Sequence, residues 1–236
     1  MNLSPDQAVY FVLGPFQLNN TIVSTWIVMF LLVLASWIAT RKLSTGTEIS
    51  RLQNFLEVLI SGIREQIKEV SGQDALPFLP FVGTLFIFIA AANILGILPI
   101  LEVERNGATI PYSYVSPTGS LSTTAALAFC VFIAVPIYGI GRKGVLGYLK
   151  NYVKPSFVML PFNIVGEVSR TLALAVRLFG NIMSGSLIAA VLLAIVPILV
   201  PVVMAALGLL TGVIQAYIFA MLAMVYIASA TNEQQG

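Results

Sequence analysis

Histidine is absent from this sequence of 236 residues, and cysteine occurs once, at Cys130. Without histidine, the chain lacks the commonest metal ligand and the commonest proton carrier near neutral pH. A single cysteine excludes a disulfide within the chain. The sequence also has no phosphate-binding glycine loop, no cluster of metal ligands and no nucleophile paired with a base. We therefore expect neither an active site nor a bound cofactor within this chain alone.

Charged residues are also scarce. They make up only 9% of the chain, whereas hydrophobic residues make up 58%, and the mean hydropathy is +0.95. This composition is typical of a polytopic membrane protein and not of a soluble domain. The net charge of +2 does not indicate nucleic acid binding, because the basic residues lie in segments beside apolar runs. We expect a lipid bilayer around the chain and no nucleic acid partner.

The apolar runs predict an all-α integral membrane protein, with a single membrane domain over residues 1–236. We expect about five transmembrane helices and one amphipathic surface helix, which Thr45 and Glu48 begin as a capping box. The predicted spans cover residues 21–39, 76–99, 120–141, 156–195 and 199–230, and the amphipathic helix covers 45–70. Residues 100–119 and 142–154 are predicted to be loops.

The last two spans are too long to cross a bilayer upright. At about 1.5 Å per residue each is roughly 45 to 60 Å long, against about 30 Å of hydrocarbon. The sequence therefore predicts a long, steeply tilted hairpin. Gly208 and Gly212 predict a patch at which these two helices pack closely.

The distribution of Lys and Arg predicts the orientation. The segments after the first and third spans carry five and four basic residues, residues 1–20 carry none, and the segment after the second span carries one. We expect an external tail over residues 1–20, without the basic start of a signal peptide, and a cytoplasmic C-terminus. Four aromatic residues suit anchoring at the membrane interface: Trp26, Trp37, Tyr148 and Tyr152.

Three ionisable residues, Glu167, Arg170 and Arg177, interrupt the fourth span. A charge at mid-bilayer costs at least about 2.5 kcal/mol, so it requires a reason. At 100° per residue, the polar side chains of this span gather on one helix face. Residues at intervals of seven form a polar stripe, flanked by Glu167 and Asn181: Asn163, Arg170, Arg177 and Ser184.

Arg177 has no acidic partner nearby in the sequence. Glu167 and Arg170 stand three residues apart, as a structural ion pair or as part of an ion path. Glu167 is roughly 15 Å from Arg177 along the helix axis, and arginine cannot become neutral by losing its proton. Arg177 thus faces a water-filled cavity or a carboxylate of another chain. Gln215, in the last span, is expected to form a hydrogen bond with the stripe.

The sequence from Arg177 to Asn181, Arg-Leu-Phe-Gly-Asn, resembles a motif of subunit a of the F-type ATP synthase membrane sector. The resemblance extends from the first span onward. Its further elements are Glu167, Arg170, the segment Gln215 to Phe219, and Pro117-Thr118 before Ser122-Thr123-Thr124.

This resemblance implies a stator subunit of a bacterial cell (inner) membrane, with no active site of its own. In that family the arginine faces a carboxylate of the rotating c-subunit ring and blocks leakage between two offset ion half-channels. Arg177 would take this role, and Gln215 would be the matching polar residue on the last helix. The implied partners are the c-subunit ring, the b-subunit peripheral stalk and the remainder of the ATP synthase.

The chain departs from the family at the outward-facing half-channel. Ser186 stands where many members have glutamate, Gly208 where some have histidine, and Gly96 and Ser120 where an acid is common. We expect instead a water-lined path through a set of small polar residues: Asn93, Ser120, Ser122, Ser184 and Ser186. Such a path suits H⁺ and hydrated Na⁺ alike, so both remain open as the translocated ion.

Two other classes of function compete with this interpretation. One is a self-contained ion channel or secondary transporter that uses Arg177 as a selectivity charge. Such transporters tend to contain internal repeats, which are not evident here. The other is a membrane assembly scaffold without transport.

Overall fold

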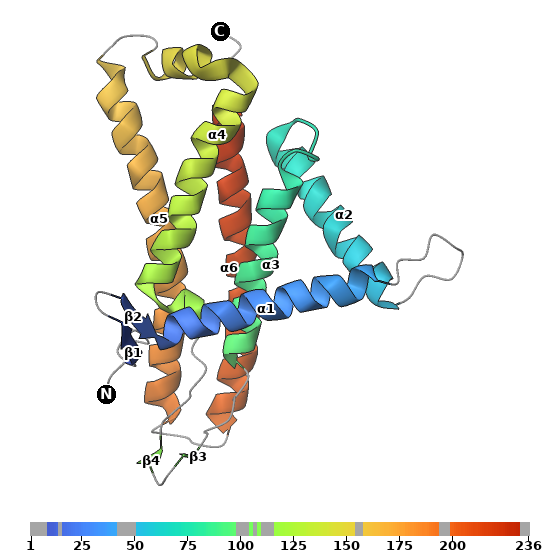
Figure 1. Cartoon of the computed structure of the whole chain (residues 1–236), viewed down its shortest axis with the longest axis vertical. Helices are drawn as coiled ribbons and strands as arrows, with labels where there is room; N and C mark the ends of the chain where they lie inside the picture. The colour runs from blue at the N-terminus through green and yellow to red at the C-terminus, as the bar shows by residue number, and fades with distance from the viewer. Residues whose placement is uncertain are drawn as a thin grey trace.

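A computed structural model of the chain describes residues 9–13, 16–41, 51–97, 104–105, 108–109, 116–153, 158–193 and 199–231. Its long helices are α1 (Asn20–Thr40), α2 (Arg51–Ser71), α3 (Leu79–Ile97), α4 (Leu121–Val153), α5 (Met159–Leu193) and α6 (Leu199–Thr231) (Figure 1). A short 3₁₀ helix, η2, covers Pro117–Gly119. The predicted all-α fold is confirmed.

Two small antiparallel hairpins accompany the helices. The first pairs β1 (Val9–Leu13) with β2 (Phe16–Asn19), and the second pairs β3 (Glu104–Arg105) with β4 (Ala108–Thr109). The second hairpin is the described part of the predicted loop over 100–119, together with Ser116 and η2. Thr45 and Glu48, the predicted capping box, lie outside the described residues.

Five helices are long and apolar enough to cross a membrane, namely α1, α3, α4, α5 and α6. Helix α2 is not among them, because charged residues fill much of its surface. Its apolar side turns toward the bundle, where Ile63 and Ile67 are buried. The Tyr217 hydroxyl on α6 also donates a hydrogen bond to Gln66 Oε1 at 2.6 Å. The predicted amphipathic helix is present over Arg51–Ser71, and its apolar face packs against the bundle at Ile63 and Ile67, whereas Phe55 and Ile60 are exposed.

The prediction of a loop over residues 142–154 is wrong. Helix α4 continues to Val153 and changes direction at Gly144, whose φ of 72° lies in the left-handed region (Figure 1). Glycine adopts this conformation without the steric cost that other residues carry, so one residue turns the helix. The turn brings Tyr148 back onto α4 and leaves it only 9% exposed. The prediction that Tyr148 anchors the chain at the membrane interface is therefore wrong, because its side chain is buried.

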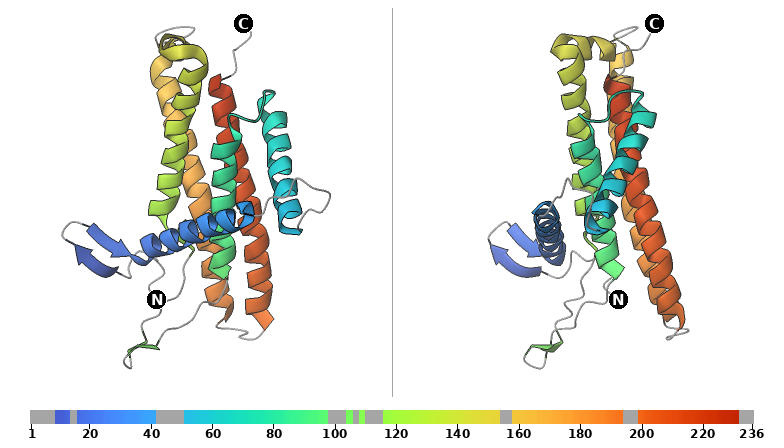
Figure 2. Two further views of the ribbon diagram at one scale, coloured as in Figure 1. Left: turned by 45° about the vertical axis from the view of Figure 1, so that its right-hand side comes forward. Right: turned by 90° about the vertical axis from the view of Figure 1, so that its right-hand side faces the viewer.

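Helix α6 contacts four other long helices, α2, α3, α4 and α5 (Figure 2). Small side chains on it, Ala216, Ala220 and Ala223, are completely buried and allow neighbouring helices to approach closely. Large buried side chains fill the space around them: Phe78 directly before α3, Val82 and Ile89 of α3, Val131 of α4, Leu174 and Leu178 of α5, and Phe219, Met224 and Ile227 of α6.

Gly212 serves a different contact from the one predicted. A Cβ atom at this position would lie 2.8 Å from Asn93 Cβ on α3. The glycine thus allows α6 to approach α3, and not α5. Sequence spacing placed Gly212 on a packing face, but it did not identify the neighbouring helix.

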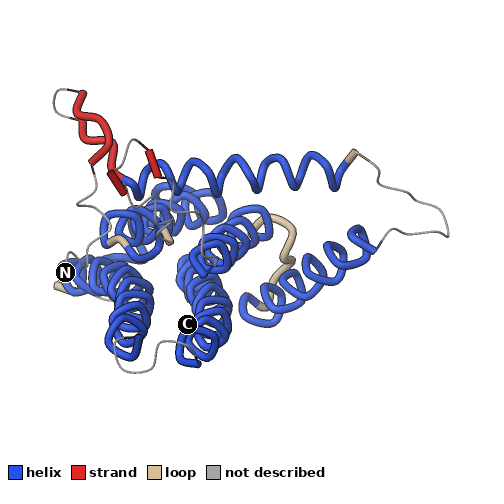
Figure 3. The backbone as a smooth tube through the Cα atoms, turned by 90° about the horizontal axis from the view of Figure 1, so that it is seen from below, coloured by secondary structure: helices blue, strands red, loops and turns tan. Residues whose placement is uncertain are grey.

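Helix α1 runs across the bundle that α3 to α6 form (Figures 1 and 3). Its 21 residues extend about 31 Å, which matches the hydrocarbon thickness. Helices α5 and α6, with 35 and 33 residues, each extend about 50 Å. Because α1 crosses them, these helices cannot all follow the membrane normal, and their lengths favour α1 as the upright one. This arrangement agrees with the predicted steeply tilted hairpin.

Candidate functional site

The polar stripe lies on α5, along the border between its packed and exposed faces. An α-helix drifts by about 20° for each seven residues, so the stripe winds slowly around the axis. Asn163, at one end, is partly buried, whereas Arg170, Arg177 and Ser184 are exposed. The stripe therefore begins inside the bundle and emerges on its surface.

Arg177 lies near the middle of α5, about 24 to 27 Å from either end of the helix. This is too far for its side chain to reach the membrane surface along the helix. Its guanidinium group is exposed, and among the described residues it forms no hydrogen bond or ion pair. Glu167 is the one acidic residue on the described parts of α3, α4, α5 and α6. The described part of the chain therefore does not neutralise Arg177.

Asn181, one turn beyond Arg177, links the stripe to α6. Its Nδ2 donates a hydrogen bond to Oε1 of Gln215, as predicted. Gln215 is only 2% exposed, and its Nε2 has no hydrogen-bond partner among the described residues. A buried donor without a partner costs about 1 to 3 kcal/mol. Gln215 thus retains a buried NH₂ group that can still donate hydrogen bonds beside the stripe.

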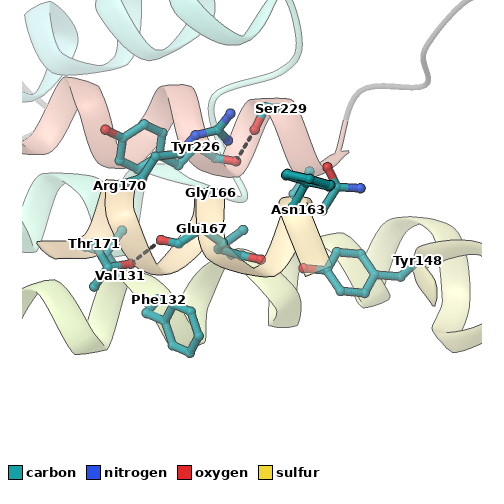
Figure 4. Close-up of a pocket in the computed structure, with 13 residues that line it drawn as sticks. Val131, Phe132, Tyr148, Asn163, Gly166, Glu167, Arg170, Thr171, Tyr226 and Ser229 are labelled. Carbon is teal, nitrogen blue, oxygen red and sulfur yellow. Dashed lines mark hydrogen bonds between the residues drawn. The ribbon is translucent and has the colours of Figure 1, made fainter. Parts of the chain in front are cut away.

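Glu167 and Arg170 line a cavity of about 320 Å³ between α4, α5 and α6 (Figure 4). The Arg170 guanidinium lies 5.8 Å from the centre of the Tyr226 ring, a distance typical of a cation–π contact. Further polar groups that line the cavity are Tyr148, Asn163, Thr171 and Ser229. Such a lining suits water and small ions, and the cavity includes a carboxylate and a guanidinium at a bundle end.

Asn93 belongs to a second polar cluster, which joins α3, α6 and η2. Its Nδ2 donates to the carbonyl oxygen of Gly212 at 3.0 Å, and its Oδ1 accepts a hydrogen bond from the Thr118 hydroxyl. The Ser116 hydroxyl donates to the Ala92 carbonyl oxygen at 3.1 Å and lies 3.3 Å from Asn93 Oδ1. Both Nδ2 and Oδ1 of the Asn93 amide are thus hydrogen-bonded, and this residue has a clear structural role.

The four serines predicted for the outward path lie in different environments. Ser120 is 1% exposed, and its Oγ accepts a hydrogen bond from the N–H group of Ser122, which is exposed. Ser184 and Ser186 are exposed and donate to carbonyl oxygens of their own helix, those of Gly180 and Met183. None of these four serines lines the cavity that contains Glu167 and Arg170.

Sequence reasoning missed several residues of these clusters. Tyr226 and Ser229 follow Gln215 by eleven and fourteen residues, spacings that return to nearly the same helix face. A search for polar residues on the Gln215 face would therefore have found them. Ser116 and Tyr148 had no such signal, because η2 and the bend at Gly144 determine where they lie.

Comparisons with known proteins agree on one family. The family model described as ATP synthase A chain matches residues 22–228. The chain is 56% identical to ATP synthase subunit a 2 of Acaryochloris marina over 235 residues, covering 100% of this chain and 95% of that protein. It is 54% identical to ATP synthase subunit a of Albidiferax ferrireducens over 232 residues, covering 98% and 95%. Chlorobium luteolum ATP synthase subunit a 1 is 52% identical, with 100% of both chains covered.

Proposed function

The chain belongs to the ATP synthase A chain family, and on this premise we propose that it is the stator subunit that couples ion translocation to rotation. In this proposal Arg177 faces the rotating c-subunit ring, and the chain provides two offset half-channels that lead ions to and from the ring. The translocated ion is H⁺ or Na⁺. Movement of one charge across 100 mV releases about 2.3 kcal/mol, and this energy drives ATP synthesis or is supplied by ATP hydrolysis.

The exposed, unneutralised guanidinium of Arg177 carries this proposal. A charge that no described group of its own chain offsets requires a partner at the same membrane depth. A c-ring carboxylate is such a partner, and arginine at close range favours its ionised form. Arg177 then keeps the passing carboxylate ionised and separates the two half-channels.

The cavity beside Glu167 and Arg170 supports one half-channel. Its inner end, at Arg170 and Thr171, lies about 10 Å short of Arg177 along α5. A water-filled path from this end of the bundle would therefore stop before the stator charge. The basic segments predict that the C-terminal end of α6 lies on the cytoplasmic side, so in this proposal the cavity opens toward the cytoplasm.

The other half-channel is proposed to pass the C-terminal half of α5. Asn181, Gln215, Ser184 and Ser186 offer neutral polar groups beyond Arg177. Asn93, Ser120 and Ser122 lie near η2, which packs against α5. Because none of these side chains titrates near neutral pH, water between them would carry the ion.

The proposed assembly contains the c-subunit ring, the b-subunit peripheral stalk and the remainder of the ATP synthase. Helix α1 offers a surface for such partners, because side chains such as Trp26, Phe30 and Val33 are more than half exposed. Much of the exposed apolar surface of the chain would face lipid.

The experiment that tests the function is ATP-driven ion uptake into liposomes that contain the whole complex. Wild type is compared with Arg177→Ala, with pH and Na⁺ reporters and a protonophore present. Arg64→Ala, which removes an exposed cation from α2, is the matched control. We expect uptake to vanish in Arg177→Ala at normal assembly and to persist in Arg64→Ala, and the reporters identify the ion.

Two other outcomes would contradict the proposal. Ion flux through the purified subunit alone, lost on Arg177→Ala, would indicate a self-contained channel or transporter. Normal uptake by the Arg177→Ala complex, or a defect confined to assembly, would indicate a scaffold.

A further inference from the structure

Tyr148 lies at one end of the cavity that contains Glu167 and Arg170, which we call its outer end because it is the end nearer the end of the bundle. The cavity extends along α5 from Thr171 and Arg170 to Asn163, which is close to the beginning of the helix. Figure 4 shows Tyr148 beside Asn163 at one end and Thr171 with Val131 at the other. The Tyr148 hydroxyl points toward the Glu167 side of the cavity. The ring therefore stands between Glu167 and the end of the bundle.

Two glycines hold the Tyr148 ring in this place. Gly144, with its φ of 72°, turns α4 so that the residues after it return toward the bundle. Gly139 provides the surface on which the ring rests, since a Cβ atom there would lie 2.5 Å from Tyr148 Cε2. The ring is thus packed directly on the helix backbone, and Tyr148 is 9% exposed.

We propose that Tyr148 is a positioning residue that narrows the outer end of this cavity and so controls how water and ions reach Glu167. The first part of this proposal, that Tyr148 controls access to Glu167, depends on the geometry alone. The second part, that the species passing Tyr148 is the translocated ion, rests on the function proposed above.

Thiol labelling inside the cavity tests this proposal directly. Cys130 is the only cysteine, so Cys130→Ala gives a cysteine-free chain. Gly166 lines the cavity, and a Cβ atom there meets nothing within 4 Å, so Gly166→Cys places a thiol without a clash. The rate of reaction with a membrane-impermeant methanethiosulfonate is then measured for the whole complex in inside-out vesicles.

Three further substitutions are compared in this background. Tyr148→Ala removes the ring, and we expect labelling of Gly166→Cys to become about tenfold faster, equivalent to lowering a barrier by about 1.4 kcal/mol. Tyr148→Phe keeps the ring, so its rate should stay within about twofold of the unmodified chain. Gly139→Ala retains Tyr148 but displaces the ring, and should accelerate labelling as Tyr148→Ala does.

A second thiol separates access from general loosening of the fold. Gly62→Cys lies on α2, where a Cβ atom also meets nothing within 4 Å, and its labelling rate should not respond to changes at Tyr148. Unchanged rates at Gly166→Cys in both Tyr148→Ala and Gly139→Ala would overturn the proposal. Equal acceleration in Tyr148→Phe, or acceleration at both thiols, would overturn it as well.

This test is independent of the stator function. Labelling requires neither pumping nor a charge at Arg177, so slow labelling in an Arg177→Ala complex remains the expected result. Failure of the stator proposal would appear as continued ATP-driven uptake in Arg177→Ala. Failure of the access proposal would appear only in the labelling rates.

Discussion

Arg177 combines a permanent charge with an apolar position halfway along a helix of 35 residues. Lysine at such a position can lose its proton on burial, and aspartate or glutamate can gain one. Arginine has no such route, because its guanidinium group stays protonated at any accessible pH. A fixed cation therefore remains at this depth in every state of the protein. Constancy of charge is what a stator opposite a titrating ring requires.

Arg177→Lys should abolish coupled pumping although it preserves the formal charge. The ammonium group is compact and strongly hydrated, lacks the planar five-donor fork, and has a pKa that burial lowers. We expect ATP-driven ion uptake by reconstituted complexes to fall at least about tenfold, the effect of 1.4 kcal/mol on a barrier. Assembly should be normal, as judged by the yield of purified complex. Uptake at the wild-type rate would show that positive charge alone suffices.

At the scale of elements, close helix approaches depend on individual glycines. Gly212 allows the backbone of α6 to meet Asn93, and Asn93 in turn donates to the Gly212 carbonyl oxygen. Through Thr118 and Ser116 the same asparagine holds η2. The contact between Asn93 of α3 and Gly212 of α6 therefore also positions η2, which precedes α4.

Gly212→Ala should destabilise the subunit. The added methyl group would lie 2.8 Å from Asn93 Cβ, and overpacking of this kind typically costs about 1 to 3 kcal/mol. We expect the purified complex to lose the subunit at a lower temperature than wild type does. Gly83→Ala is the matched control, because its nearest neighbour, Leu79 Cδ1, is 3.9 Å away. Equal stability of the two variants would mean that α3 and α6 separate without cost.

At the scale of the whole molecule, the charge distribution and the crossing of α1 together predict the orientation in the membrane. Segments with many basic residues remain on the cytoplasmic side. Helix α2 follows the first of these crossings and is too polar to form another. Both α2 and the end of α6 should therefore lie on the cytoplasmic side.

Labelling from the two sides of the membrane tests this orientation. In the Cys130→Ala background, Gly62→Cys should react with an impermeant thiol reagent in inside-out vesicles and not in right-side-out vesicles. Ile22→Cys, at the beginning of α1, should show the reverse pattern. Reaction of both thiols from the same side would place the ends of α1 differently and refute the charge-based orientation.

Features that depend on a single helix were predictable from the sequence. Long apolar runs identified the five membrane helices, charge in an apolar span identified Arg177, and a buried amide on α6 implied the bond between Gln215 and Asn181. Features that depend on several helices were not predictable in this way. Gly144 resembled a loop residue in its basic surroundings, although the helix continues past it. The Glu167 cavity requires side chains from three helices to meet, which no periodicity indicates.

The contacts of α6 with four other helices have a consequence for biosynthesis. The ribosome makes α6 after α2, α3, α4 and α5, yet all four pack against it. Until it leaves the ribosome, the faces of those helices that pack against α6 lack this neighbour, although α4 and α5 already pack against each other. The interior described above is therefore complete only after α6 has been made. If translation stopped before α6, we would expect membrane proteases to degrade the truncated chain. It would not be incorporated into a complex.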